Sequence, residues 1–444
     1  MLVELHVERF KSFREARLPL AELTVLIGAN ASGKSNLLEA LQFLSWLARG
    51  RRLSDLLYAL RDRQLDVRGT LSRLAHEGSS WFTLGGLVGA EPQSALTFWS
   101  QVGLRDDGLH ILQEEAFESQ KGSDDVLYLV KELDDTPRGT PRVDGVLYVA
   151  YDPFGVRTGG NIIACTDQQA VFTQLTTPAR IPSKFTLAQQ RLPQAARQIQ
   201  AALESILFLD PVPRRMRDYS FTVERTLQGD GSNLSAVLYD LCEKQQRKSE
   251  VLAFVRSLPE QNILDLTFLT GPRGEVMLQL TESFGGNAQT YEAALLSDGT
   301  LRVLAVAAAL HSVSEGALVV IEEIDNGVHP TRAKLLLDNI QRVARERKLR
   351  VLLTTHNPAL LDAIPVDAIP DVVACYRDPE EGDSRLVSLR ELQDYPELVA
   401  QGPVGQLVTR GILERYLKSP KGPEEKAEQA QKVLEMLRSP AGEP

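Results

Sequence analysis

Eight consecutive residues near the N-terminus form a pattern suited to holding phosphate. GANASGKS at Gly28 to Ser35 satisfies GxxxxGK[ST], follows the apolar run Leu23–Ile27 and precedes a segment with helical periodicity. In such a loop, glycines let backbone N–H groups turn toward phosphates, the lysine reaches the outer phosphates, and the final hydroxyl binds Mg²⁺. The alternative is a glycine-rich turn that needs no ligand. The order of strand, loop and helix favours phosphate binding.

Two adjacent carboxylates end a second apolar run. Glu322 and Glu323 follow Leu318–Ile321 directly. On an open parallel sheet, ligands lie at the carboxyl ends of the strands, so these acids would face the phosphates. Glu322 would then support Mg²⁺ and its waters, and Glu323 would orient and deprotonate the attacking water. Taken alone, the pair also fits two solvated acids at the end of a strand.

A histidine and a serine complete the set of residues that suggest chemistry. His356 follows a further apolar run and a pair of threonines, so its imidazole would donate to the terminal phosphate, or would be an ordinary structural histidine. Ser297-Asp298-Gly299-Thr300 precedes a helical pattern, where Ser297 or Asp298 is expected to cap the helix. The functional alternative is that the N–H groups of this helix terminus meet the γ-phosphate held by a second protomer.

The elements that carry these residues alternate between strands and helices. Short runs rich in Val, Leu and Ile predict strands at Leu2–Val7, Leu23–Ile27, Ala317–Ile321 and Arg350–Thr354. Apolar residues at helical spacing predict helices at Asn36–Leu47, Leu301–Leu310 and Thr331–Arg345. Because the later strands are continuously apolar, we expect a parallel sheet covered on both faces.

The middle of the chain has a different character. Short β-prone runs from Trp81 to Tyr151 predict an antiparallel meander. Further predictions are helices at Leu187–Leu207 and Asn233–Leu258, a hairpin around Gly271–Gly274, and a turn-prone stretch at Lys11–Arg17 between the first two strands.

Composition excludes several classes of protein. The 444 residues are 43% apolar and 24% charged, which excludes fibrous and wholly disordered chains. We find no apolar run long enough to span a membrane and no secretory signal, so we expect a mature protein that begins at Met1 and stays in the cytoplasm. Cys165, Cys242 and Cys375 suggest neither disulfides nor a zinc site. The net charge of −10 argues against coating nucleic acid by bulk charge.

Together the motifs resemble the ABC-type ATPases of the SMC/RecF branch, and within it the compact prokaryotic AAA "predicted ATPase" and OLD-like proteins. The resemblance covers Leu2 to about Leu47 and about Asp210 to Leu417. It implies the following motifs: Walker A at Gly28–Ser35, the signature at Ser297–Thr300, Walker B at Glu322 and Glu323, the D-loop at Asp325–Pro330 and the switch histidine at His356.

The resemblance also implies a fold and a set of site residues. The fold class is α/β, with a mixed or parallel core sheet, an antiparallel β lobe and a helical insertion. We expect one discontinuous ATPase domain over 1–420, with core segments at about 1–50 and 210–420, an insertion at about 51–209 and a flexible tail at 421–444. The implied metal ligands are Ser35 and Glu322, and the catalytic residues are Glu323, His356 and Lys34. The implied ATP-binding residues are Gly28, Ala29, Asn30, Ala31, Ser32, Gly33, Lys34, Ser35, Asn36, Ser297 and Gly299.

The implied activity is Mg²⁺-dependent hydrolysis of ATP to ADP and phosphate by a homodimer or higher homo-oligomer that closes on ATP. The implied process is linked to DNA, in repair or antiviral defence, with a separate effector such as a nuclease or toxin and no membrane partner. The alternative is an ATP-held scaffold that restrains a toxin or nuclease with little turnover. A transporter motor is disfavoured by the long chain between Ser35 and Ser297.

This sequence departs from the family pattern in three places. Glu322 stands where many relatives have aspartate, SDGT replaces LSGGQ, and the Mg²⁺-sensing glutamine has only Gln189 or Gln190 as candidates. No DxD pair follows His356, so we expect the nuclease domain of OLD proteins to be missing.

Two arginine clusters are candidates for contacting the phosphate backbone of DNA. The alternative is a solvated face, and in the first cluster the alternation with Asp55, Asp62 and Asp66 favours internal ion pairs. The clusters comprise Arg49, Arg51, Arg52, Arg61, Arg63 and Arg68, and then Arg214, Arg215 and Arg217.

Overall fold

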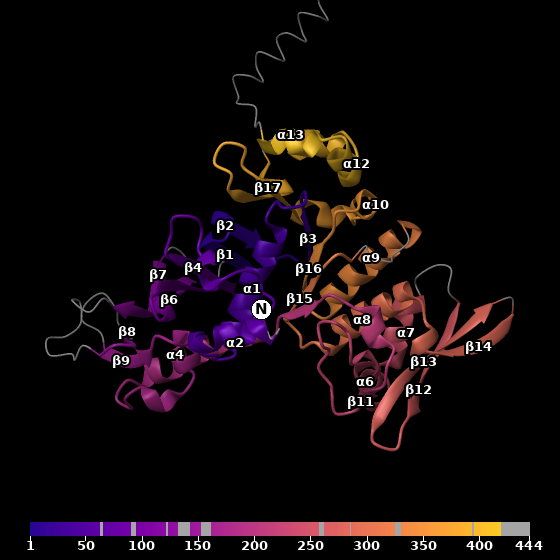
Figure 1. The fold of residues 1–444 in the computed structure, drawn as a ribbon, viewed down its shortest axis with the longest axis horizontal. Helices are drawn as coiled ribbons and strands as arrows, with labels where there is room; N and C mark the ends of the chain where they lie inside the picture. Colours follow the sequence, from indigo (N-terminus) through magenta and orange to yellow (C-terminus); the bar gives the residue numbers. More distant parts are fainter. Residues whose placement is uncertain are drawn as a thin grey trace, which may run out of the picture.

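A six-stranded sheet forms the centre of the computed structural model (Figure 1). Its strands run in the order β10 (Leu207–Leu209), β15 (Leu318–Ile321), β16 (Arg350–Thr354), β3 (Leu23–Ile27), β17 (Val372–Arg377) and β18 (Ser384–Ser388). The first five are parallel and β18 is antiparallel, which confirms the mixed core sheet. The structure describes residues 1–62, 65–89, 95–120, 123–131, 143–151, 161–256, 262–284, 286–324, 330–392 and 395–418.

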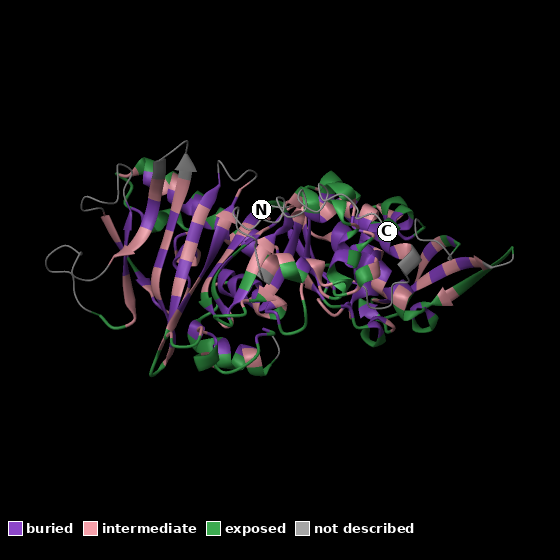
Figure 2. Ribbon diagram, turned by 90° about the horizontal axis from the view of Figure 1, so that it is seen from above, coloured by how far each residue is buried: buried purple, intermediate pink, exposed green. Residues whose placement is uncertain are grey.

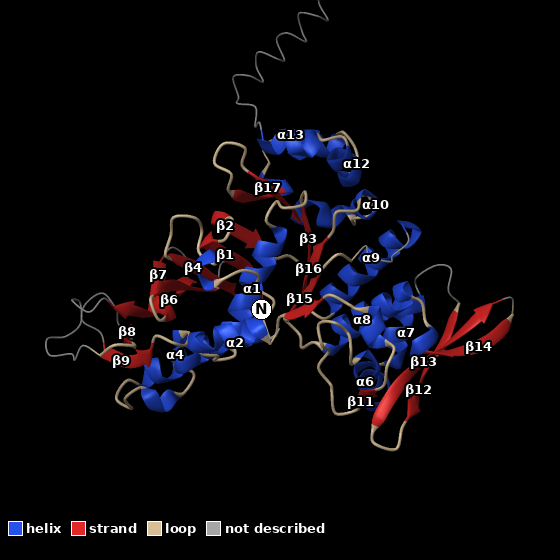
Figure 3. Cartoon of the chain, in the orientation of Figure 1, coloured by secondary structure: helices blue, strands red, loops and turns tan. Residues whose placement is uncertain are grey.

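The central sheet separates two hydrophobic cores. Alternate residues of β15 and β16 point to opposite faces, so Val320 and Leu352 belong to one core while Ile321 and Leu353 belong to the other. Helix α1 (Lys34–Ala48) fills the first core, and α8 (Asp298–Ser312) and α9 (Pro330–Glu346) fill the second. Figure 3 shows α1 on one side of these strands and α8 with α9 on the other. Burial on both faces explains why the strands are continuously apolar.

An eight-stranded antiparallel sheet forms the β lobe. The sequence-consecutive strands β4 to β9 confirm the meander. The strand order is β2 (Phe13–Pro19), β1 (Leu2–Phe10), β4 (Trp81–Val88), β5 (Leu96–Arg105), β6 (Gly108–Gln120), β7 (Ser123–Lys131), β8 (Val146–Tyr151) and β9 (Asn161–Thr166). Strands of this lobe show alternating burial in Figure 2.

The prediction of a turn-prone stretch at Lys11–Arg17 was wrong for most of its length. Only Lys11 and Ser12 form a turn, and the chain from Phe13 continues as β2 beside β1. Phe13, Ala16 and Leu18 are buried, which supplies an apolar face despite the polar residues between them. The N-terminal segment therefore contributes β1 and β2 to the β lobe and β3 to the central sheet.

A smaller sheet and its helices lie beyond α8 (Figure 1). The predicted hairpin is present as β12 (Ile263–Thr270) and β13 (Glu275–Phe284), which β11 (Ser220–Phe221) and β14 (Asn287–Glu292) extend. The single helix predicted at Asn233–Leu258 is wrong. It is divided into α6 (Leu234–Tyr239), a π-helical turn and α7 (Lys248–Arg256), because Gln245 N–H bonds the Asp240 carbonyl and Gln246 takes a positive φ of 55°.

The remaining helices are mostly short. The predicted helix near Leu187–Leu207 is α4 (Thr186–Glu204), which packs on the β lobe. The others are α2 (Leu56–Arg61), α3 (Val171–Gln174), α5 (Pro213–Met216), α10 (Pro358–Leu361), α11 (Tyr395–Ala400), α12 (Val404–Thr409) and α13 (Ile412–Lys418). The expected tail at 421–444 lies outside the described residues. Within the described part of the chain, no helix is long and apolar enough to cross a membrane.

Candidate functional site

The glycine-rich loop joins β3 to α1 and curls around its own lysine. Gly28, Ala31 and Gly33 have φ values of 152°, 63° and 119°, which lie outside the usual range of L-residues. The ammonium of Lys34 donates to the carbonyls of Gly28 (2.5 Å) and Ala29 (3.0 Å). Burial lowers the pKa of Lys34, and the nearby Cys375 and Glu323 oppose that shift. The loop therefore surrounds a partly desolvated cation at the N-terminus of α1, as a phosphate-binding loop does.

The hairpin of β17 and β18 supports this loop from behind. Ser384 Oγ donates to the Ser32 carbonyl at 2.6 Å, Cys375 Sγ donates to the same oxygen at 3.3 Å, and Arg377 Nε donates to the Ala31 carbonyl at 3.2 Å. The packing is close, because a Cβ added at Gly28 would overlap the carbonyl oxygen of Cys375. The curl of the loop thus depends on residues more than 300 positions downstream.

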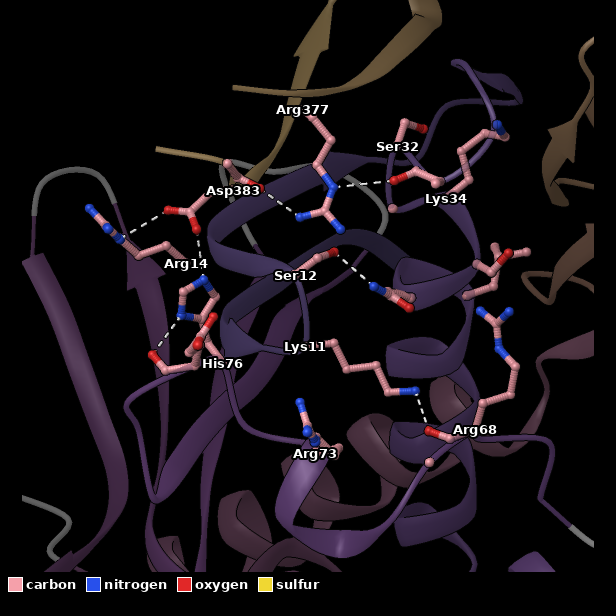
Figure 4. Close-up of a pocket in the computed structure, with 18 of the residues that line it drawn as sticks. Lys11, Ser12, Arg14, Ser32, Lys34, Arg68, Arg73, His76, Arg377 and Asp383 are labelled. Carbon is pink, nitrogen blue, oxygen red and sulfur yellow. Dashed lines mark hydrogen bonds and ion pairs between the residues drawn. The ribbon is translucent and has the colours of Figure 1, made fainter. Parts of the chain in front are cut away.

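A cavity of about 1400 Å³ opens at the loop (Figure 4). Of the predicted site residues, Asn30, Ala31, Ser32, Gly33, Lys34, Ser35, Asn36, Glu322, Glu323 and His356 line it. Gly28 and Ala29 contribute the carbonyls that hold Lys34. Residues that follow the three neighbouring parallel strands β15, β16 and β3 therefore share one cavity, as their positions at the ends of those strands predict.

The two adjacent glutamates have different surroundings. Glu322 is half-buried, and burial raises its pKa to about 7, with further contributions from the negative charges of Asp210, Asp66 and Glu323. Glu323 is exposed to the cavity and has a positive φ of 45°. A half-buried carboxylate with a raised pKa among other acids is a suitable ligand for a divalent cation, since the cation would offset the repulsion.

Sequence reasoning missed a charged cluster in which Lys11 and Arg68, two residues that line the cavity, meet the buried Glu39. Glu39 on α1 is only 3% exposed and accepts from the Lys11 ammonium, from the Arg68 backbone N–H (3.1 Å) and from Arg68 Nε (2.6 Å). Burial lowers the pKa of Lys11 despite this partner. A charged residue on the apolar face of the predicted helix was the available signal, because a buried carboxylate requires partners.

A second missed cluster lies at the rim. Asp383, in the β17–β18 turn, accepts from His76 Nε2 at 2.7 Å and forms an ion pair with Arg14 Nε at 3.1 Å. Figure 4 shows His76, Arg14 and Asp383 together on the side of the cavity away from Lys34. Asn36 Nδ2 donates to Ser12 Oγ, and the Ser12 hydroxyl is hydrogen-bonded to Ser384 Oγ, at 2.7 Å each, so the turn before β2 is fixed to the phosphate loop as well.

The predicted signature does not line this cavity. Ser297 caps α8 and accepts from the Thr300 N–H at 3.1 Å. Arg217 holds the same segment by donating to the Leu296 carbonyl and to Asp298. Neither Ser297 nor Gly299 is among the lining residues. Within one chain, the phosphate loop and the signature therefore belong to separate surfaces.

The other candidates are placed elsewhere. Gln189 and Gln190 do not line the cavity, and Gln189 Nε2 donates to the Ile181 carbonyl at 3.1 Å. The predicted D-loop at 325–329 lies outside the described residues.

The ion pairs expected in the first arginine cluster were wrong for its described residues, and Arg63 lies outside the described residues. Within the described part of the chain, Arg49, Arg51, Arg52 and Arg61 form no ion pair with Asp55, Asp62 or Asp66, and Arg68 pairs with Glu39 instead. In the second cluster, Arg215 and Arg217 pair with Asp230 and Asp298.

Comparisons with known proteins match two separate stretches of the chain. A family model described as "AAA ATPase domain" matches residues 1–56, and one described as "AAA domain, putative AbiEii toxin, Type IV TA system" matches residues 177–362. The first contains the phosphate loop, and the second contains Ser297, Glu322, Glu323 and His356.

Two relatives share parts of the chain. Structural maintenance of chromosomes protein 1 of Arabidopsis thaliana is 40% identical over 74 residues, which are 15% of this chain and 6% of that protein. DNA replication and repair protein RecF of Synechococcus sp. is 42% identical over 82 residues, which are 17% of this chain and 21% of that protein. These matches show that the chain carries AAA ATPase domains of the SMC/RecF type. It spans about a fifth or less of the length of these relatives.

One solved structure aligns with most of the chain at low identity. The SMC head bound to the C-winged helix domain of ScpA aligns with 87% of this chain and 97% of that chain, at 11% identity and a TM-score of 0.48.

Proposed function

We propose that this SMC/RecF-type ATPase hydrolyses ATP as a Mg²⁺-dependent homodimer, with nucleotide bound between two copies. The observation that carries the proposal is that the predicted motifs lie in two separate places within one chain. The phosphate loop, both glutamates and His356 line one cavity, whereas Ser297 and Gly299 lie outside it on a capped helix terminus. A second copy that brings this terminus to the cavity would complete the site, so ATP binding and dimer closure would be one event.

The phosphate loop fits a magnesium triphosphate. The N–H groups of Gly28 to Asn36 and the ammonium of Lys34 would hold the phosphates, and Lys34 would exchange its loop carbonyls for phosphate oxygens. Ser32 Oγ is buried and has no hydrogen-bond partner in the described part of the chain, which leaves a donor in the cradle. Ser35 and Glu322 would bind the metal, whose contribution is to neutralise charge on the outer phosphates.

The remaining residues would act on water and on the terminal phosphate. Glu323 reaches the cavity from the end of β15 and would accept the proton of the attacking water. His356, exposed at the end of β16, would donate to the γ-phosphate. Ser297 and the N–H of Gly299 from the second copy would complete the donor set. Catalysis of this kind depends on position and charge compensation.

The biological process is a further part of the proposal. We propose a DNA-linked role in repair or antiviral defence, in the cytoplasm, with a separate effector protein. The RecF relative is named a DNA replication and repair protein, and one matching family model names a putative toxin of a toxin–antitoxin system; both names support this choice. A second candidate is an ATP-held scaffold that restrains a toxin or nuclease partner with little turnover.

We also propose a domain organisation. The chain would form one discontinuous ATPase domain over 1–420 with the insertion at about 51–209.

Phosphate release and oligomeric mass test the proposal together. The wild-type protein should release phosphate from Mg·ATP, and the rate should respond to duplex DNA. Glu323→Gln should retain ATP and elute as a dimer only when ATP is present. Ser297→Arg should bind ATP as a monomer and fail to dimerise. A negligible rate with tight ATP binding would favour the scaffold. Equal turnover by Ser297→Arg and the wild type would contradict the composite site.

A further inference from the structure

The backbone at Glu323 has an unusual conformation. Its φ of 45° lies in the left-handed region, where a side chain with a Cβ costs roughly 1–2 kcal/mol. Lys11 and Ala31 share a positive φ and also line the cavity. Strained residues persist only where their surroundings fix them, and they gather at functional sites. The conformation of Glu323 therefore requires a neighbour that fixes it.

That neighbour is Thr354 on the adjacent strand. The parallel pairing of β15 with β16 ends at Ile321 and Leu353, one residue before each site segment begins. The Glu323 N–H then donates to Thr354 Oγ1 at 3.0 Å, and the Ile324 N–H donates to the Thr354 carbonyl at 3.4 Å. Thr354 thus receives two consecutive N–H groups just beyond the end of the ladder.

The preceding residue is held from the opposite side. Glu322 N–H donates to the Leu209 carbonyl of β10 at 3.1 Å. The two glutamates are therefore attached to different neighbours, Glu322 to β10 and Glu323 to β16. Because the two N–H groups bond to strands on opposite sides, the backbone turns between the glutamates and their side chains separate. Glu322 is half-buried, and Glu323 is exposed in the cavity.

We infer that Thr354 is a positioning residue for Glu323, an inference that rests on the proposed role of Glu323 as general base. Thr354 is only 5% exposed and lines the cavity beside the glutamates. Its hydroxyl holds the left-handed turn that directs the Glu323 carboxylate toward the terminal phosphate. Thr354 itself transfers no proton. Loss of its acceptor would let Glu323 relax toward the right-handed region and move the carboxylate from the attacking water.

Replacement of the hydroxyl by a methyl group tests the inference. Thr354→Val keeps the shape and burial of the side chain and removes the acceptor. We expect kcat for phosphate release to fall about tenfold, the scale of one catalytic hydrogen bond, while KM for ATP stays within about twofold. Thr354→Ser keeps the hydroxyl and should restore most of kcat. Combined with Glu323→Gln, Thr354→Val should cause no further loss, because both changes remove the same function.

Thr24→Val is the matched control. Thr24 is 1% exposed near the start of the neighbouring strand β3, whereas the phosphate loop follows the end of that strand, and Thr24 Oγ1 accepts from the Ala21 N–H at 2.8 Å. This variant should lower the thermal midpoint and leave kcat unchanged. If Thr354→Val fails to fold, Thr354→Cys, with a weak sulfur acceptor, takes its place and should show the same fall in kcat.

The outcomes separate the inference from the function. Wild-type kcat in Thr354→Val, together with an inactive Glu323→Gln, would overturn the positioning role and leave the general base in place. Wild-type turnover by Glu323→Gln would instead contradict the proposed function. A rise in KM with unchanged kcat would overturn the inference too, since it would place Thr354 in ATP binding.

Discussion

Lys34 is the residue on which nucleotide binding is expected to depend most. Its ammonium bonds to carbonyls of its own loop, and burial lowers its pKa. A cation already partly stripped of water loses less when it meets a phosphate, so its charge-assisted bonds should be strong.

Lys34→Ala should therefore weaken Mg·ATP binding by about a hundredfold or more. Isothermal titration calorimetry would measure the change. Lys334→Ala, at an exposed position on α9, is the matched control and should bind as the wild type does. Binding within threefold of the wild type in Lys34→Ala would contradict the assignment of the loop.

Glu322 predicts how stability depends on pH in the absence of nucleotide and metal. Burial raises its pKa to about 7 from an ordinary value near 4.5, so the folded protein holds this proton more tightly than the unfolded chain. The free energy of unfolding should therefore fall as pH rises from about 4.5 to 7. Glu114 contributes with the same sign, since burial also raises its pKa to about 7, whereas His311, whose pKa burial lowers to about 4, contributes with the opposite sign.

Thermal midpoints across this pH range would check the prediction. Glu322→Gln should make the decline shallower than in the wild type. Mg²⁺ should raise the midpoint of the wild type at pH 8 and have less effect on Glu322→Gln. An equal effect of Mg²⁺ on both proteins would rule out Glu322 as a metal ligand.

At the scale of elements, the β17–β18 hairpin determines whether the phosphate loop keeps its curl. Gly28 lies against the Cys375 carbonyl, and its φ of 152° disfavours any side chain. Gly28→Ala should therefore displace the hairpin or the loop and weaken ATP binding at least tenfold. Gly50→Ala is the matched control: Gly50 also has a positive φ, 66°, but an added Cβ would meet nothing within 4 Å.

Fluorescent ATP-analogue binding and thermal midpoints would separate the two variants. Both should lose some stability from the strained φ, and only Gly28→Ala should lose affinity. If Gly50→Ala lost as much affinity, the effect would come from general destabilisation and not from the hairpin.

The same elements show how far sequence reasoning reached. The phosphate loop, both glutamates and His356 were predictable because each directly follows a strand of a parallel sheet, and the cavity holds them all. Thr354 and Ser384 were not, because a serine or threonine in a strand has many uses and its partner lies far away in the sequence. Glu39 carried a signal, an acid on an apolar helix face, but nothing in the sequence indicated that Lys11 and Arg68 would neutralise it.

Two elements were predicted wrongly because the local sequence preference differed from the structure that tertiary contacts favour. The polar residues between Phe13 and Leu18 favoured a turn, yet pairing with β1 and burial of alternate apolar side chains made a strand. The apolar periodicity across Asn233–Leu258 suggested one helix. The break comes at Gln246, whose positive φ leaves no clear signal in the sequence. In both regions, the local sequence favours neither alternative strongly, and tertiary contacts determine which one forms.

At the scale of the whole molecule, the separation of Ser297 from the cavity predicts complementation. Lys34→Ala disables one half of a composite site and Ser297→Arg disables the other, so each variant alone should be inactive. In an equal mixture, only a dimer of unlike subunits would hold an intact site, because Ser297→Arg does not pair with itself and Lys34→Ala holds no ATP. Phosphate release should recover to at most about half of the wild-type rate, since each mixed dimer has one working site of two.

Steady-state assays of the mixture at several total concentrations would check this recovery. As a control, adding a Lys34→Ala/Ser297→Arg double variant to the wild-type protein should not raise phosphate release, because a dimer of these two proteins has a defect in each of its sites. An inactive mixture, with each variant folded and Ser297→Arg still binding ATP, would indicate that both motifs act within one chain.

The position of β3 has a consequence for how the protein is made. This strand carries the phosphate loop and is synthesised early, yet both of its neighbours, β16 and β17, begin only at Arg350 and Val372. During translation the loop must wait, exposed or held by a chaperone, until most of the polypeptide has left the ribosome. Nucleotide therefore cannot assist the earliest steps of folding, and a nascent chain arrested before Val372 should not be retained on immobilised ATP.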